Sequence, residues 1–258
     1  MSVLERFSLE GKNALIYAPD SVYGTDIAKG LAEAGAKVWL CGDNVADLQK
    51  IANECGAEGV FEYHAGTKAE ADKLGGFIRG TMGKIDAFIE NGSHNTLKGW
   101  FNSYEEIVEN FAITQRGLML TVQAVGEIMA EQKNGSVIFI TDYAALVGCD
   151  VNNYVGCEEE MKKDFSATYG FIKGSYVNYA RQAAGFLGDA GCRCNAIAFS
   201  PKENTKPAAF EEAFIKHSHI RRMAKTEDIQ DIVVFLASDA SKYITGTTIA
   251  VDGGYTAK

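Results

Sequence analysis

Short apolar runs alternate along the chain with longer segments in which apolar residues recur at helical spacing. The short runs are apolar throughout instead of alternating with polar residues, as expected of strands buried on both faces of a sheet. On this pattern we expect strands at Ala14–Tyr17, Val38–Leu40, Val60–Tyr63, Ala87–Ile89, Ser136–Thr141, Arg193–Ala198 and Thr247–Val251.

Helical spacing is clearest in segments that lie between these strands. We expect helices at Asp26–Ala34, Asp164–Leu187 and Thr226–Leu236. Strands that alternate with helices favour right-handed βαβ units and a parallel sheet, so the pattern predicts a doubly wound α/β fold. No repeat or linker interrupts the pattern, and residues 1–258 are therefore interpreted as a single domain.

The composition is that of an ordinary globular protein, with 258 residues, 47% hydrophobic and 23% charged residues, and a net charge of −9. This acidic balance argues against a nucleic-acid partner, because phosphate binding needs a concentrated basic face. No apolar stretch approaches the ~20 residues of a membrane span. The N-terminus also lacks the layout of a secretory signal. We therefore expect a cytoplasmic protein that binds neither nucleic acid nor membrane.

The cysteines and histidines do not predict a metal site. The six cysteines contain no CxxC pair, which argues against a zinc ribbon or a thioredoxin-type motif. Cys41, Cys192 and Cys194 fall in expected strands and are interpreted as small buried core residues. His217 and His219 could form a metal pair, but the sequence places no carboxylate or cysteine beside them to complete it.

Three segments carry a resemblance to a known family. They are DIQDIVVFLASDASKYITGTTIAVDGG at residues 228–254, YGFIK at 169–173 and GCRCNAIA at 191–198. Together they closely resemble the short-chain dehydrogenase/reductase family, and the resemblance covers essentially the whole chain. It implies a Rossmann-type sheet of about seven strands, dimers or tetramers, and hydride transfer between NAD(P)(H) and an alcohol/carbonyl pair.

The catalytic positions that the resemblance implies are filled only in part. Tyr169 and Lys173 match the family's tyrosine and lysine, at i and i+4 on one helix face, where the ammonium would lower the pKa of the phenol. Asp142 stands at the serine position, and an ionised aspartate cannot donate a hydrogen bond to a carbonyl oxygen. Thr114 maps to the asparagine position by its spacing from Gly117.

The glycine-rich turn of the family, TGxxxGxG, is largely lost. Ala18, Val22 and Gly24 stand at its three glycine positions, so Gly24 alone is retained. Those glycines let the backbone approach a pyrophosphate at a helix N-terminus, where each charge-assisted hydrogen bond is worth about 1.5–3 kcal/mol. Pro19 removes one further N–H donor. The sequence therefore predicts that this turn does not bind a dinucleotide tightly.

The other cofactor positions favour NAD over NADP, if a dinucleotide binds. Asp43 follows the second strand, where an acidic residue would meet the ribose of NAD and repel the 2′-phosphate of NADP. Asn91 lies in the stretch that corresponds to the family's Asn-Asn-Ala-Gly. His64 aligns with the aspartate that meets adenine, and Phe199 and Ser200 replace the Pro-Gly pair beside the nicotinamide.

The segment 143–168 is about fourteen residues longer than the resemblance leads us to expect. It lies beside the family's active site, where a long loop can be a substrate lid or a partner-binding element. A solvated charged loop with an extra helical turn is the other interpretation.

Three functions stay open. The first is a subunit whose own NAD site has degenerated and which supports an active paralogue in a homo- or hetero-oligomer; the two-subunit hydroxybenzylsuccinyl-CoA dehydrogenase of anaerobic toluene degradation is a family precedent. The second is an active NAD(H)-dependent oxidoreductase that uses Tyr169 and Lys173. The third is a cofactor-free lyase similar to the halohydrin dehalogenases, which pair tyrosine with arginine and keep the serine. We expect the first.

Overall fold

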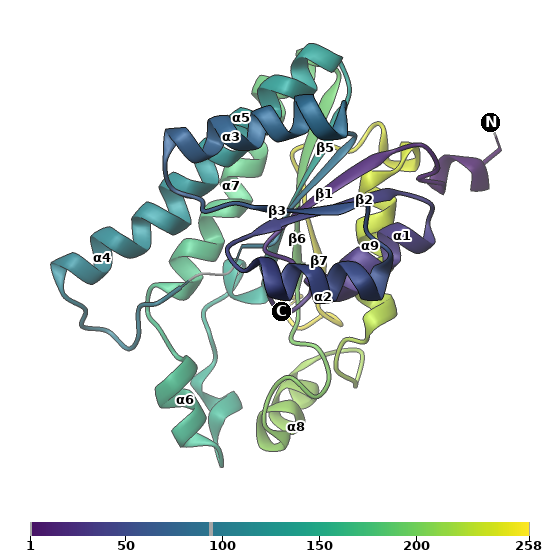
Figure 1. The fold of residues 1–258 in the computed structure, drawn as a ribbon. Coiled ribbons are helices and arrows are strands. Elements are labelled where there is room, and N and C mark those ends of the chain that lie inside the picture. Colours follow the sequence, from purple (N-terminus) through teal and green to yellow (C-terminus); the bar gives the residue numbers. More distant parts are fainter. Residues whose placement is uncertain (1, 93–94, 258) are drawn as a thin grey trace.

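The computed structural model describes residues 2–92 and 95–257, in which a seven-stranded sheet carries helices on both faces (Figure 1). All neighbouring strands are parallel, in the order β3-β2-β1-β4-β5-β6-β7. The strand order reverses between β1 and β4, and α/β proteins of this type bind ligands beyond the carboxyl ends of the strands at such a point. The strands are β1 (Asn13–Tyr17), β2 (Lys37–Gly42), β3 (Gly59–Glu62), β4 (Ala87–Glu90), β5 (Gly135–Asp142), β6 (Cys192–Phe199) and β7 (Thr248–Val251).

The helices form one layer on each face of the sheet. One face is covered by α1 (Gly24–Glu33), α2 (Val45–Cys55) and α9 (Thr226–Ala237). The other is covered by α3 (Lys68–Phe77), α5 (Leu118–Gln132) and α7 (Tyr169–Leu187). The remaining helices are α4 (Tyr104–Phe111), which runs into α5 through a π-helical turn at Ala112–Gly117, and α6 (Glu158–Asp164) and α8 (Ala208–His217).

Burial on both faces explains why the strands read as continuous apolar runs. Leu15, Phe88 and Ile138 are fully buried in β1, β4 and β5, and each such side chain contributes about 1.5–3 kcal/mol relative to an exposed one. All seven expected strands are present, and the predicted doubly wound α/β fold is confirmed. The edge strand β7 is only partly buried.

The expected helix at Asp164–Leu187 begins five residues later than predicted. The chain leaves α6 at Phe165, whose backbone is extended (φ −71°, ψ 126°). Ser166 then pairs with Gly99 in an isolated parallel bridge. This tertiary pairing overrides the local helical pattern, and α7 therefore starts at Tyr169.

The long segment between β5 and α7 packs onto α8 as a small separate core. Tyr154 meets Phe210 edge-on, with ring centroids 4.9 Å apart, and the side-chain amide of Asn153 donates to the hydroxyl of Tyr255 at 2.9 Å. The part of the segment that carries these residues is therefore not a solvated loop. Across residues 2–92 and 95–257, no helix is long and apolar enough to cross a bilayer.

Candidate active site

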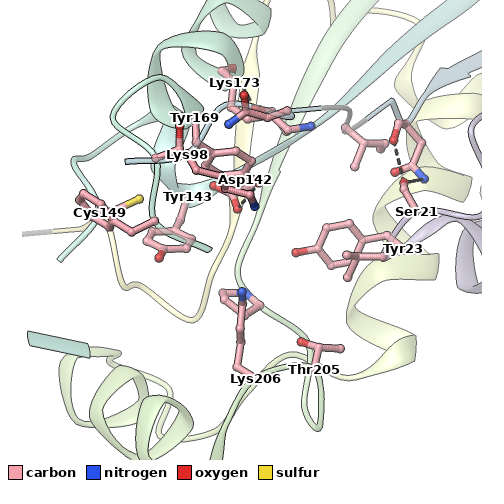
Figure 2. Close-up of a pocket in the computed structure, with 18 of the residues that line it drawn as sticks. Ser21, Tyr23, Lys98, Asp142, Tyr143, Cys149, Tyr169, Lys173, Thr205 and Lys206 are labelled. Carbon is pink, nitrogen blue, oxygen red and sulfur yellow. Dashed lines mark hydrogen bonds between the residues drawn. The ribbon is translucent and has the colours of Figure 1, made fainter. Parts of the chain in front are cut away.

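A cavity of about 260 Å³ lies beyond the carboxyl ends of the central strands (Figure 2). Its walls come from the segments that follow β1, β4 and β6, from the end of β5 and the segment between β5 and α7, and from the first turns of α7. It therefore occupies the position at which the strand order reverses. Residues far apart in sequence meet there because parallel strands all end at the same edge of the sheet.

Asp142 and Tyr169 form the floor of this cavity. The Tyr169 hydroxyl donates to Asp142 Oδ2 at 3.0 Å, and the backbone N–H of Ala144 donates to Asp142 Oδ1 at 2.6 Å. Both carboxylate oxygens thus have a partner, and the phenol proton is directed at a carboxylate. Burial raises the pKa of Asp142 above its ordinary value, although the Ala144 N–H and the charge of Lys173 oppose that rise.

The expectation that Lys173 lowers the pKa of Tyr169 is wrong. Burial raises the pKa of the phenol well above 10, and the adjacent Asp142 charge raises it further. Lys173 Nζ donates instead to the backbone carbonyl of Gly92 at 3.0 Å. Burial also lowers the pKa of Lys173 itself. Tyr169 is therefore held as a neutral phenol.

Thr114 faces a smaller neighbouring cavity of about 20 Å³, which Tyr169 and Lys173 also line. Thr114 belongs to the π-helical turn before α5, and its hydroxyl donates to the carbonyl of Asn110 at 2.8 Å. Tyr169 and Lys173 line both cavities, whereas Asp142 lines only the larger one and Thr114 only the smaller one. Their catalytic roles stay predictions.

Glu90 is a buried carboxyl that the sequence reasoning did not single out. It ends β4 and lines the smaller cavity beside Lys173. Glu90 Oε1 accepts from the Gly92 N–H at 3.1 Å, while burial raises the pKa of Glu90 to about 8. The sequence carries a signal for this residue, since Glu90 directly follows the apolar run Ala87–Ile89 at the end of a strand.

The turn between β1 and α1 is closed by its own contacts. Ala18 has a left-handed backbone (φ 52°), the Ser21 N–H donates to the Ala18 carbonyl at 3.2 Å, and the Gly24 N–H donates to the Ser21 carbonyl at 3.0 Å. A Cβ at Gly24 would lie 2.2 Å from the Pro19 carbonyl oxygen. Gly24 is thus needed for the packing of the turn on itself.

Tyr23 spans the gap between this turn and the end of β6. Its ring lies 5.0 Å from that of Phe199, and its hydroxyl donates to the Ser200 carbonyl at 2.9 Å. The side chain of Val22 is 57% exposed and lines the cavity. Figure 2 shows the ring of Tyr23 projecting into the cavity beside Ser21. With the Ser21 and Gly24 amides used inside the turn and the side chains of Val22 and Tyr23 beside it, the residues present do not fit a dinucleotide pyrophosphate.

The remaining cofactor candidates lie on either side of this turn. Asp43 follows β2, where His64 Nδ1 lies 3.1 Å from Asp43 Oδ1, and it does not line the large cavity. Asn91 fixes the turn, since its side-chain amide donates to the Ala18 carbonyl at 2.9 Å and to Ser21 Oγ at 2.6 Å. Asp43 and Asn91 therefore have structural partners, and a cofactor role for either stays a prediction.

Comparison with known proteins shows similarity over nearly the whole chain. A family model described as enoyl-(acyl carrier protein) reductase matches residues 18–256. An uncharacterized oxidoreductase of Mycobacterium tuberculosis (strain ATCC 25618 / H37Rv) is 27% identical over 268 residues, which cover 98% of this chain and 94% of that protein. L-rhamnose 1-dehydrogenase (NAD(P)(+)) of Sphingomonas sp. (strain SKA58) is 26% identical over 262 residues, 95% of this chain and 96% of that protein. A crystal structure of a short-chain type dehydrogenase/reductase from Mycobacterium marinum has a TM-score of 0.83 at 24% identity, with 100% of both chains covered.

Proposed function

The chain belongs to the short-chain dehydrogenase/reductase family, and on that premise we propose that it is a subunit of an oxidoreductase assembly in which an active paralogue carries out hydride transfer. Its own site is kept as a folded remnant of the family's catalytic centre. The observation that carries the proposal is the hydrogen bond from Tyr169 to Asp142.

This hydrogen bond opposes the acid–base step of a reductase. A general acid must direct its proton at the substrate oxygen, whereas Tyr169 directs it at a carboxylate. Breaking a hydrogen bond to a charged group costs about 1.5–3 kcal/mol. An ionised Asp142 would also repel the negative charge that develops on a carbonyl oxygen, where the family uses a serine hydroxyl to donate. The turn that Tyr23 closes supports the same proposal, because it does not fit the pyrophosphate of a dinucleotide cofactor.

Exposed apolar residues supply surfaces on which such an assembly could form. Phe171 and Phe186 project from α7 with 64% and 86% exposure, and Phe101, just before α4, is 91% exposed. Large exposed apolar side chains are a common feature of protein–protein contacts. The edge strand β7 offers a second surface. A homo- or hetero-oligomer is therefore part of the proposal.

A comparison of the chain alone with its native assembly tests this function. We expect the purified chain to show no NAD(H)-dependent turnover of alcohols or ketones, and the complex isolated from the native host to be active. Tyr169→Phe in this subunit should leave kcat of the complex unchanged, since the chemistry takes place in the paralogue. Turnover by the chain alone that Tyr169→Phe abolishes would contradict the proposal.

An active NAD(P)-dependent dehydrogenase is the second candidate. It is favoured by the meeting of Tyr169 and Lys173 in one cavity and by the relative whose name includes NAD(P)(+). The same turnover assay separates it from the first. The lyase alternative has less support, because Asp142 and Lys173 stand where halohydrin dehalogenases have serine and arginine.

A cytoplasmic location is also part of the proposal. All six cysteines are free thiols, which is typical of proteins kept in a reducing compartment.

A further inference from the structure

The charge of the large cavity is opposite to that of the chain. Within the described part of the chain, its charged lining residues are Lys98, Lys173, Lys206 and Asp142. The whole chain has the reverse balance, with 25 lysines and arginines against 34 aspartates and glutamates. A cleft whose lining carries an excess of one sign of charge among apolar groups focuses the field and concentrates ions of the opposite sign. The lining thus attracts anions.

Two of these lysines flank the cavity on different walls. Lys98 comes from the segment after β4 and Lys206 from the segment after β6. Figure 2 shows the side chain of Lys206 pointing from the lower wall toward Asp142. Burial raises the pKa of Asp142, and the positive charge of Lys206 is one of the nearby groups that oppose this rise. Lys173 is buried, and its Nζ donates to the backbone carbonyl of Gly92.

The floor of the cavity, formed by Asp142 and Tyr169, offers hydrogen-bond acceptors, whereas the lysine ammonium groups offer donors. Asp142 receives a hydrogen bond on each carboxylate oxygen, from Ala144 and from Tyr169. A carboxylate offers about four lone-pair sites in total, so acceptor capacity is left over on Asp142 and on the Tyr169 oxygen. A ligand group that meets this floor must therefore donate a hydrogen bond, as a hydroxyl does.

The lining of the cavity is partly aromatic. Tyr23, Tyr154 and Phe165 line the cavity together with the apolar side chains of Val22 and Ile140. A volume of about 260 Å³ is enough for a small molecule. Small size, an anionic group and a hydroxyl donor are thus required together.

We infer that this cavity binds a small hydroxycarboxylate, whose hydroxyl donates to the Asp142–Tyr169 floor and whose carboxylate lies against Lys98 and Lys206. The inference deepens the proposed function by naming the ligand class of the same site. It rests on the proposed function in that the ligand is expected to bind without a dinucleotide.

Calorimetric titration with L-malate, succinate and inorganic phosphate tests each part of the inference. Malate carries both groups, succinate lacks the hydroxyl, and phosphate supplies charge without the carbon frame. We expect malate to bind about tenfold more tightly than succinate, because one hydrogen bond to a charged group is lost. We also expect the affinity for malate to fall as salt is added.

Three variants locate the binding. Lys98→Met and Lys206→Met should each weaken malate binding about fivefold to tenfold, because each removes one partner of the carboxylate. Lys216→Met is the matched control, since Lys216 is exposed on α8 and does not line the cavity. Circular dichroism of every variant checks that it is folded.

Each outcome decides the inference. Malate binding that is weakened by Lys98→Met and Lys206→Met but not by Lys216→Met supports it. The absence of malate binding both with and without NADH, equal binding of phosphate and malate, or equal loss in the Lys216→Met control overturns it. Repeating the titration with NADH present separates the two proposals. Malate binding that requires NADH would refute the proposed function and leave the hydroxycarboxylate inference standing.

Discussion

Replacement of Glu90 by glutamine should stabilise the protein at neutral and alkaline pH. Glu90 is 1% exposed, and its Oε2 atom has no hydrogen-bond partner among the described residues. Burial raises the pKa of this carboxyl from 4.5 to about 8. The folded state therefore retains a proton that the unfolded chain releases at much lower pH.

The sign and size of the effect follow from linkage. Between about pH 4.5 and pH 8 the folded state binds more protons than the unfolded state at this position, so stability falls as pH rises. The loss is about 1.4 kcal/mol per pH unit at most, which gives an upper limit of about 5 kcal/mol across the window. Glutamine keeps the shape of the side chain and cannot ionise, so Glu90→Gln should remove this loss.

Urea unfolding at pH 5, 6.5 and 8 is the assay. We expect the free energy of unfolding of the wild type to fall more steeply with pH than that of Glu90→Gln, with a difference of about 2 kcal/mol or more at pH 8. Glu109→Gln is the control, because Glu109 is exposed on α4. Parallel pH profiles for wild type and Glu90→Gln would refute the reasoning that burial penalises the Glu90 charge.

The other predictions concern the turn after β1 and the assembly surface. Gly24→Ala should lower the free energy of unfolding by about 1–3 kcal/mol or more through its clash with Pro19, whereas Gly76→Ala, in open space on α3, should raise it by about 1 kcal/mol; urea unfolding measures both. Val22→Gly with Tyr23→Ala should reopen the turn and increase NADH affinity in calorimetric titration, and an unchanged affinity would show that these side chains do not block the site. Phe186→Ser should shift the assembly toward smaller species in analytical ultracentrifugation without loss of fold.

The sheet could be predicted because its signal is local. Each central strand is buried on both faces, so runs such as Ala87–Ile89 contain no polar residue, and their alternation with helices fixes the layer order. The start of α7 could not be predicted in this way. The residues before it have helical composition, but Ser166 is held by pairing with Gly99, which is distant in sequence.

In the candidate site, too, some features could be predicted from the sequence and others depend on contacts between distant residues. The approach of Tyr169 to Asp142 was predictable from the resemblance, because both positions belong to one family motif. The hydrogen bond from Tyr23 to Ser200 was not, since it joins residues that are 177 positions apart in the sequence. Nor could the sequence show where the ammonium of Lys173 points, which depends on the backbone carbonyl of Gly92.

Calorimetric titration of the purified chain with NADH and NADPH tests the central claim most directly. The closed turn and the bridging Tyr23 predict no binding of either dinucleotide up to millimolar concentration. Micromolar binding of NADH would contradict the account, and it would return Tyr169 and Lys173 to the role of catalytic residues.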